Sequence, residues 1–179
     1  MIILLTGATH TGKTALAQKL LEKYKIPYLS IDHLKMGLIR SGCTNLTPED
    51  DDALTEYLWP IVREIIKTAI ENNQSMIVEG CHVPLDWRIG FGAEYLRHIR
   101  CFCLVMTEKY IGNNFDKIKC YANAAERRLD DSHLTPKFLI EENKKYMDFR
   151  RAGGEIILID ESYDRVYPRF CVTVLKPQN

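Results

Sequence analysis

The stretch Gly7-Ala8-Thr9-His10-Thr11-Gly12-Lys13-Thr14 decides how the rest of the chain is interpreted. It fits the pattern G-x-x-x-x-G-K-[ST] at every fixed position, and it lies between the apolar run Ile2 to Thr6 and a helical pattern over Ala15 to Tyr24. Strand, loop and helix in this order are the setting of a phosphate-binding loop, because glycines let backbone N–H groups and a helix N-terminus converge on anionic oxygens. The pattern therefore predicts that residues 7–14 bind nucleotide phosphates.

The lysine and the last hydroxyl of this loop have separate expected roles. Lys13 is expected to reach the β- and γ-phosphates, and the Thr14 hydroxyl is expected to bind Mg²⁺. An ordinary glycine turn that carries a lysine by chance would explain the letters but not the strand and the helix around them. The expected nucleotide contacts within the loop are Gly7, Ala8, Thr9, His10, Thr11, Gly12, Lys13 and Thr14.

Apolar runs rich in β-branched residues alternate with helical patterns along the whole sequence, which favours parallel strands joined by helices. We therefore predict an α/β fold: the three-layer sandwich of P-loop NTPases, with a five-stranded, mainly parallel sheet, helices on both faces and a small lid. A sixth strand at Cys171 to Leu175 is a further expectation. The five strands are predicted at Ile2 to Thr6, Tyr28 to Ile31, Ser75 to Glu79, Arg100 to Met106 and Glu155 to Ile159.

Two helices have clear start signals. A cap at Thr47 and apolar pairs that recur every four residues as far as Ile70 predict one long helix, which Pro60 should kink rather than end. Thr135 followed by proline predicts a second helix that runs to about Arg151. The polar segment 107–134 is expected to be a lid-like excursion from one domain that spans residues 1–179.

Composition excludes several classes of protein. Lysine plus arginine and aspartate plus glutamate both total 24, so no overall positive field favours nucleic acid or an anionic membrane. The first apolar run, Met1 to Leu5, is too short for a signal peptide or a membrane span. Six dispersed cysteines lack zinc spacing, and Cys101 and Cys103 are expected to be buried thiols. A soluble, cytoplasmic monomer or homodimer is the expectation.

Two acids stand where strands end, close to the predicted phosphate site. Asp32 follows the second strand and Glu79 ends the third. Phosphoryl transfer needs groups that position the nucleophile and neutralise charge, so we expect Asp32 to be the base on the acceptor side and Glu79 to support the metal. The reverse assignment stays open. Asp32 as a helix cap and Glu79 as a solvated strand end are the simpler alternatives.

Cations are available for both the transferred phosphoryl group and the acceptor. Arg127 and Arg128 lie in the polar excursion, where a mobile flap could bring an arginine over the phosphates. Lys35 and Arg40 follow Asp32 and are candidates for binding an anionic acceptor. All four are equally consistent with solvated surface charges.

With these residues in place, the chain resembles the P-loop kinases of small molecules: adenylate, shikimate and gluconate kinases, the zeta-toxin group and 2-phosphoglycerate kinase. The resemblance implies that Asp32 contacts the phosphoryl acceptor and that the arginine-bearing excursion is the lid. The segment Ile77 to Pro84 is similar to the third-strand segment of 2-phosphoglycerate kinases, which makes His82 a candidate acceptor contact. It differs from the Asp-Gly-Phe-Pro-Arg stretch of adenylate kinases, which argues against AMP as acceptor.

The sequence thus predicts an ATP- and Mg²⁺-dependent phosphotransferase with a small anionic or hydroxyl-bearing acceptor. One rival is a GTP-dependent switch, for which Asn113-Asn114-Phe115-Asp116 partly matches the guanine-reading motif Asn-Lys-x-Asp. Another is a regulatory or toxin-like nucleotide-binding protein whose acceptor is not a free metabolite. The identity of the acceptor and the preference for ATP over GTP are not fixed by the residues.

Overall fold

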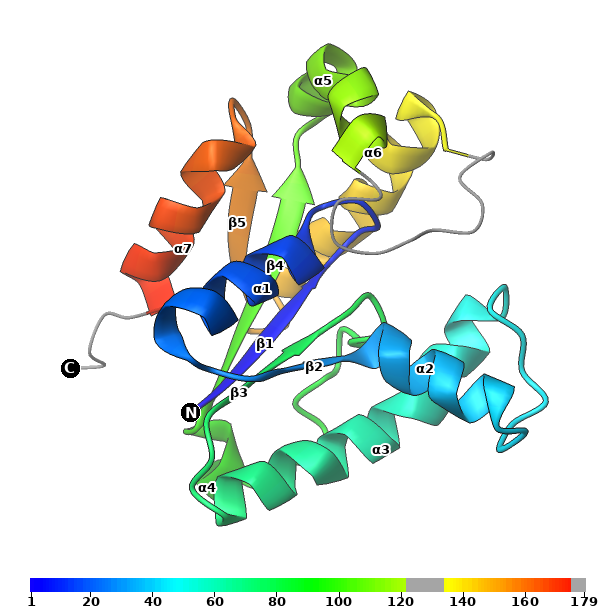
Figure 1. The fold of residues 1–179 in the computed structure, drawn as a ribbon, viewed down its shortest axis with the longest axis vertical. Coiled ribbons are helices and arrows are strands. Elements are labelled where there is room, and N and C mark those ends of the chain that lie inside the picture. The colour runs from blue at the N-terminus through cyan, green and yellow to red at the C-terminus, as the bar shows by residue number, and fades with distance from the viewer. Residues whose placement is uncertain (122–133, 175–179) are drawn as a thin grey trace.

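The first strand lies at the centre of a five-stranded sheet in which all neighbouring strands are parallel (Figure 1). The computed structural model describes residues 1–121 and 134–174. The strand order is β2-β3-β1-β4-β5, and each predicted strand is confirmed to within one residue at either end. The strands are β1 (Ile2–Gly7), β2 (Tyr28–Ser30), β3 (Met76–Glu79), β4 (Ile99–Met106) and β5 (Glu155–Ile159).

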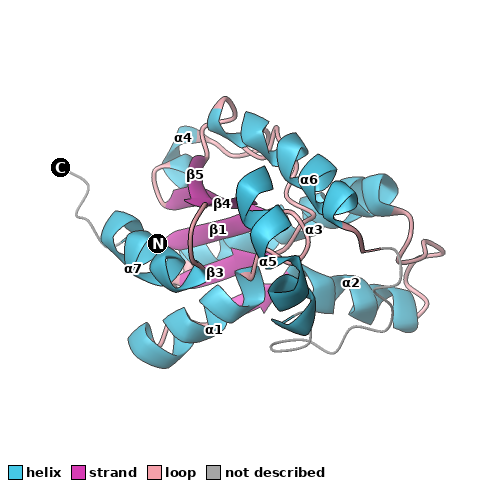
Figure 2. Cartoon of the chain, turned by 90° about the horizontal axis from the view of Figure 1, so that it is seen from above, coloured by secondary structure: helices cyan, strands magenta, loops and turns pink. Residues whose placement is uncertain are grey.

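Helices connect successive strands and cover both faces of this sheet (Figure 2). The α-helices are α1 (Lys13–Tyr24), α2 (Ile31–Arg40), α3 (Asp51–Glu71), α4 (Ala93–Leu96), α5 (Glu108–Tyr121), α6 (Pro136–Lys145) and α7 (Val166–Val174). Two short 3₁₀ segments are η1 (Tyr146–Arg150) and η2 (Tyr163–Arg165). None of the described helices is long and apolar enough to cross a membrane.

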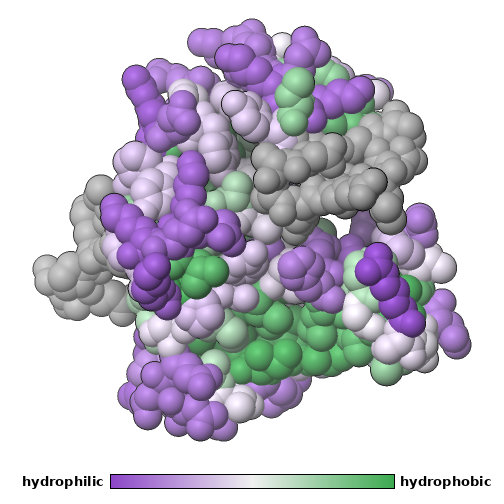
Figure 3. Space-filling model, in the orientation of Figure 1, coloured by the Kyte–Doolittle hydropathy of each residue, from purple (hydrophilic) through white to green (hydrophobic). Residues whose placement is uncertain are grey.

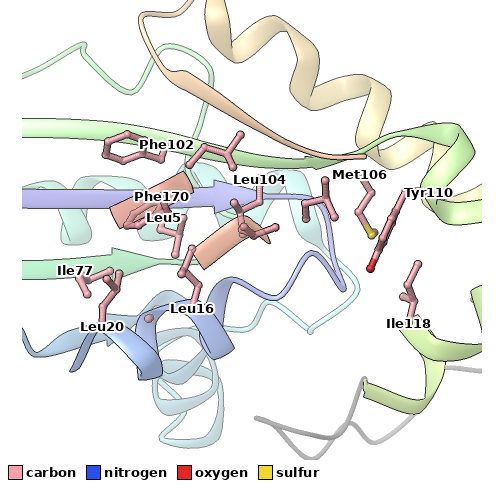
Figure 4. Close-up of a cluster of buried hydrophobic side chains, with 14 of the residues drawn as sticks. Leu5, Leu16, Leu20, Ile77, Phe102, Leu104, Met106, Tyr110, Ile118 and Phe170 are labelled. Carbon is pink, nitrogen blue, oxygen red and sulfur yellow. The ribbon is translucent and has the colours of Figure 1, made fainter. Parts of the chain in front are cut away.

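Successive side chains of β1 pack alternately into two separate hydrophobic cores. Ile3 and Leu5 belong to one cluster, together with side chains of α1 and α7, and Figure 4 shows Leu16 and Phe170 packed against the strands there. Ile2 and Leu4 belong to the other cluster, which includes the buried side of α3. Because a strand buried on both faces needs cover on both, this arrangement confirms the predicted three-layer α/β fold.

The sixth strand predicted at Cys171 to Leu175 is wrong, because Cys171 lies in helix α7. Val166 and Phe170 are both buried in the first core, and their spacing of four residues is helical rather than extended. The Phe170 ring meets the ring of Phe102 on β4 edge to face, with centroids 5.0 Å apart. Packing of α7 on the sheet therefore decides the structure of this apolar run. Leu175 lies outside the described residues.

The helix predicted to start at Thr47 begins later, at Asp51. The Asp50 carboxylate accepts hydrogen bonds of 2.8 Å from both the backbone N–H and the hydroxyl of Thr47, which closes a turn before the helix. Beyond this turn, α3 continues through Pro60 to Glu71, as the apolar pairs predicted.

Helix α6 begins at Pro136 with Thr135 as its cap, as predicted, since the Thr135 hydroxyl accepts from the N–H of Phe138 at 3.1 Å. It ends earlier than expected, at Lys145, where the chain tightens into η1.

An apolar groove lies at the opposite end of the sheet from the phosphate loop. It is formed by α3 and the start of β3, where Figure 3 shows hydrophobic side chains on the surface. Met76 is the first residue of β3, whereas the phosphate loop follows the last residue of the parallel neighbour β1. The groove is therefore separate from the carboxyl edge of the sheet. Its lining residues are Ile61, Glu64, Ile65, Thr68, Ala69, Gln74 and Met76.

Candidate active site

The loop 7–14 leaves β1 in a tight backbone curve that only glycine accommodates at its start. Gly7 has φ 140°, and a Cβ there would collide with the carbonyl oxygen of Leu104 on β4. Gly12 has φ 78°, and it immediately precedes α1, whose N-terminus has no side-chain cap. The first N–H groups of α1 are thus not used by a side-chain cap, an arrangement that suits the anion site predicted from the motif.

Lys13 lies within this curve and is only 8% exposed. Its ammonium donates to the carbonyl oxygens of Gly7 at 2.9 Å and Ala8 at 2.8 Å. The Thr11 hydroxyl also donates to the Ala8 carbonyl oxygen, at 2.8 Å. Lys13 is therefore held against the loop by its own backbone, in the position from which it can reach an anionic ligand.

The loop is also tied to a distant segment of the chain. The Tyr163 hydroxyl, in η2 after β5, donates to the Gly12 carbonyl oxygen at 2.7 Å. A Cβ on Gly12 would collide with the Tyr163 side chain, so glycine is required here by both space and φ. Burial raises the pKa of Tyr163, which keeps its hydroxyl protonated as a donor.

Glu79 and Thr14 meet beside the loop. The register places Glu79 at the end of β3, next to Leu5 of β1, and its Oε2 accepts a hydrogen bond of 3.3 Å from the Thr14 hydroxyl. Glu79 is only 1% exposed, so it is not a solvated strand-end acid. A hydroxyl and a carboxylate side by side offer the hard oxygen ligands that Mg²⁺ prefers, and these residues fit a magnesium site.

A second cluster forms where β2 and β3 end. Asp32 lies in the first turn of α2, and its Oδ1 is 2.8 Å from the Lys35 ammonium and 4.0 Å from Nε2 of His82. Lys35 Nζ is in turn 3.3 Å from His82 Nε2, and Nδ1 of His82 is 2.9 Å from the Thr55 hydroxyl of α3. Four side chains from three segments are thus linked in one chain of polar contacts.

Charge in this cluster is balanced between Asp32 and Lys35. Burial acts to raise the pKa of Asp32, but the Lys35 ammonium, with help from Lys13 and His82, outweighs it and holds the pKa below its usual range. Burial likewise acts to lower the pKa of Lys35, and the ion pair with Asp32 outweighs it and raises that pKa. Both groups are therefore charged near neutral pH, and the field of Lys13 reaches Asp32 from the phosphate loop.

The ligand atoms of Asp32, Cys81 and His82 lie within 4.8 Å of one another, a spacing that could suit a metal ion. Two observations favour a hydrogen-bonded cluster instead. The Lys35 ammonium contacts both Asp32 and His82. Burial raises the pKa of the Cys81 thiol to about 11, so its surroundings favour the neutral thiol over the thiolate that binds metals.

The structure brings together most of the residues singled out in the sequence. The N-cap of α2 is Ser30 rather than Asp32, so the capping interpretation of Asp32 is wrong. Arg40 is exposed at the far end of α2, about 12 Å along the helix axis from Asp32 at 1.5 Å per residue. Arg127 and Arg128 lie outside the described residues, as do residues 122–133 of the predicted lid, whereas the first part of that segment forms α5.

Sequence reasoning missed Thr55 and Tyr163. Both contact the site through a single side-chain hydroxyl, from α3 and η2 respectively. Neither has a motif around it, and only the tertiary fold brings them to the carboxyl edge of the sheet.

The partial guanine motif is not placed to read a base. Asn113 to Asp116 lie inside α5, and the Asn114 side chain donates to the Tyr110 carbonyl oxygen at 3.0 Å. A motif that reads guanine must lie in a loop after a strand, so this geometry disfavours the GTP switch.

No family model and no curated protein matches the sequence. Among solved structures, the chain is similar to shikimate kinase from Bacteroides thetaiotaomicron, with a TM-score of 0.60, 13% identity, and coverage of 97% of this chain and 98% of that chain. It is also similar to shikimate kinase from Aquifex aeolicus, with a TM-score of 0.53, 17% identity, and coverage of 97% and 96%. The chain therefore shares the fold of these two shikimate kinases, which is a fold that the resemblance implied.

Proposed function

We propose that this chain is a P-loop kinase that transfers the γ-phosphoryl group of ATP, with Mg²⁺, to a small acceptor that carries a hydroxyl group. The observation that carries the proposal is the meeting of two clusters at one edge of the sheet. The phosphate loop follows β1, and the Asp32–Lys35 pair follows β2, close enough for Lys13 to act on the pKa of Asp32. In proteins with open parallel sheets, ligands bind at the carboxyl ends of the strands, which is where both clusters lie.

In the proposed reaction, the acceptor hydroxyl oxygen attacks the γ-phosphorus while the bond to the β,γ-bridging oxygen breaks. The hydroxyl proton passes to the Asp32 carboxylate, and ADP leaves. Lys13 and the loop N–H groups hold the phosphates. Thr14 and Glu79 would hold Mg²⁺, which supplies charge neutralisation when bound.

The acceptor side favours a hydroxyl over a second anion. Both contacts to Asp32, from Lys35 and from His82, involve Oδ1, which leaves Oδ2 as the oxygen suited to take a hydroxyl proton. The Lys35 charge is already paired with Asp32, so a carboxylate placed here would be repelled by Asp32 without a free cation beside it among the described residues of this cluster.

The first test is a titration of the folded protein with magnesium ATP and magnesium GTP. The proposal expects saturable binding with a preference for ATP, and the absence of any saturable uptake would remove it. A screen of small alcohols and sugars for ATP-dependent ADP release then identifies the acceptor. ADP release that responds to no small molecule would instead favour a regulatory or toxin-like protein.

Asp32→Asn separates the acceptor side from the nucleotide side. We expect turnover to fall on the order of a hundredfold or more, since a positioned base contributes that much, while ATP affinity is retained. Asp52→Asn, at an exposed acid in the first turn of α3, is the matched control and should leave turnover unchanged. Collapse of ATP binding in Asp32→Asn would place this carboxylate with the metal.

A further inference from the structure

The orientation of the hydrogen bonds around Thr55 can be worked out from its partners. The Thr55 hydroxyl contacts the Asp51 carbonyl oxygen at 2.9 Å and Nδ1 of His82 at 2.9 Å. A carbonyl oxygen only accepts, so the single hydroxyl proton of Thr55 is donated to Asp51. The oxygen of Thr55 must therefore accept from His82, which requires the proton of His82 to be on Nδ1.

This proton placement fixes the role of the other ring nitrogen. With Nδ1 protonated, the neutral ring presents a lone pair at Nε2, and the group that faces it is the Lys35 ammonium at 3.3 Å, which only donates. His82 is 2% exposed, and burial together with the Lys35 charge lowers its pKa, so the ring is neutral near pH 7. Both nitrogens are used inside the protein.

We propose that Thr55 and His82 are positioning residues for the Asp32–Lys35 pair, in which Thr55 fixes His82 with its proton on Nδ1 and Nε2 of His82 holds the Lys35 ammonium against Asp32. This inference rests on the proposed function and revises the expectation that His82 contacts the acceptor. Helix α3 thereby influences Asp32 and Lys35 through the side chains of Thr55 and His82. Neither Asp32 nor Lys35 lies on α3 itself.

The charged groups around His82 are consistent with this arrangement. Lys35 and Asp32 approach from α2, Asp51 from the start of α3 and Lys13 from the phosphate loop. Lys35 lies between His82 and Asp32, with one N–H directed to each, so its third N–H is the one that can reach an acceptor oxygen. Loss of the Nε2 acceptor would release the ammonium from one of its two fixed partners.

Nuclear magnetic resonance of the uniformly ¹⁵N-labelled full chain at neutral pH tests the proton placement without any need for turnover. The chemical shifts of the two ring nitrogens, assigned through a His82→Gln sample, distinguish the two neutral forms and the cation. The inference expects the proton on Nδ1 in wild type and in Thr55→Ser. A proton on Nε2, or on both nitrogens, in wild type would overturn it.

Kinetics of matched variants test the positioning role. Thr55→Val and His82→Leu should lower kcat on the order of tenfold or more with the KM for ATP unchanged, because the acceptor side alone is misplaced. Thr55→Ser and His82→Gln, which can keep the hydroxyl and an acceptor for Lys35, should retain most of kcat. Thr55→Val with wild-type kcat, or Thr55→Ser as impaired as Thr55→Val, would overturn the role.

Thr68→Val is the control for the helix itself. The Thr68 hydroxyl makes the same bond to the carbonyl oxygen four residues earlier in α3, at 2.9 Å from Glu64, at an exposed position in the groove far from the site. We expect this variant to keep wild-type kcat, and an equal loss in Thr68→Val and Thr55→Val would trace the effect to α3 rather than to His82 and overturn the inference. Failure of the proposed kinase function would be seen differently, as absent nucleotide binding in wild type. That result would not depend on which ring nitrogen of His82 carries the proton.

Discussion

Lys13 illustrates how a single side chain can be fixed before it meets its ligand. Its ammonium is held by the Gly7 and Ala8 carbonyl oxygens, so little conformational freedom is left to lose when phosphates bind. In the proposed reaction, this charge would therefore be preorganised for the phosphate oxygens rather than recruited from solvent.

Lys13→Ala should reduce phosphoryl transfer on the order of a hundredfold or more, because one preorganised donor at the transferred group is lost. The fold should persist, which thermal unfolding checks, since Lys13 belongs to neither hydrophobic core. Lys19→Ala, at an exposed lysine of the same helix, serves as the control and should leave turnover unchanged. An unfolded Lys13→Ala protein would contradict the assignment.

The lowered pKa of His82 leads us to expect that the free energy of unfolding depends on pH. Its pKa is lowered below the ordinary 6.5 by burial and by Lys35, so the unfolded chain binds a proton at a higher pH than the folded chain does. The contribution of His82 to stability is therefore complete above about pH 6.5 and is lost as pH falls through the folded pKa.

Urea unfolding of wild type and His82→Gln between pH 7.5 and 5 measures this contribution. The free energy of unfolding of wild type should fall more steeply with decreasing pH than that of His82→Gln. Parallel curves for the two proteins would show that His82 carries no such proton linkage.

At the scale of single residues, sequence patterns located the groups that belong to a motif or end a strand. Lys13, Thr14, Asp32 and Glu79 follow from strand ends and a glycine-rich loop, because parallel strands bring their carboxyl ends to one edge. The role of His82 was not predictable, since the proton on its ring is set by Thr55, and no local pattern links residues 55 and 82.

Helix α6 shows the strength of local signals at the scale of an element. Thr135 caps the helix through its bond to the Phe138 N–H, and Pro136 fits the first turn, where no N–H partner is lost. These signals act over four residues and are visible in the sequence alone.

Thr135→Ala should lower the free energy of unfolding by about 1 kcal/mol, because one N–H at the start of α6 loses its acceptor. Chemical denaturation measures the change. Thr135→Ser keeps a capping hydroxyl and should restore most of the loss, so a serine variant as unstable as the alanine variant would contradict the capping role.

Elements whose limits depend on packing were harder to predict. The run Cys171 to Val174 has the composition of an edge strand, yet it continues α7, because Val166 and Phe170 anchor that helix on the sheet. Similarly, the turn closed by Thr47 and Asp50 uses the residues that would otherwise start α3. In the first case a tertiary contact overrides the propensity of the segment, and in the second a local turn replaces the helix start.

At the scale of the whole molecule, the phosphate loop depends on both ends of the chain. The Tyr163 hydroxyl donates to the Gly12 carbonyl oxygen across a sequence separation of 151 residues. Tyr163 lies just after β5, so this bond connects Gly12, the residue before α1, to a segment that follows another strand of the sheet. The loop is therefore stabilised by the tertiary fold as well as by its own sequence.

Tyr163→Phe should weaken ATP binding by roughly 1 kcal/mol, or about fivefold in Kd, because the Gly12 carbonyl oxygen keeps the Leu16 N–H but loses the Tyr163 hydroxyl, while the ring remains. Isothermal titration calorimetry with magnesium ATP measures the effect. Tyr167→Phe, at the next tyrosine along the chain, should leave Kd unchanged. Equal affinity in Tyr163→Phe and wild type would show that the bond does not shape the loop.

The same bond has a consequence for synthesis on the ribosome. Gly12 emerges early, but the Tyr163 hydroxyl that bonds to it is translated only after β5, so a nascent fragment that stops before this strand has a phosphate loop without that support. Since a ligand stabilises only the state that binds it, ATP should protect the finished polypeptide far better than its incomplete precursors. Nucleotide would thus favour survival of fully translated copies over truncated ones.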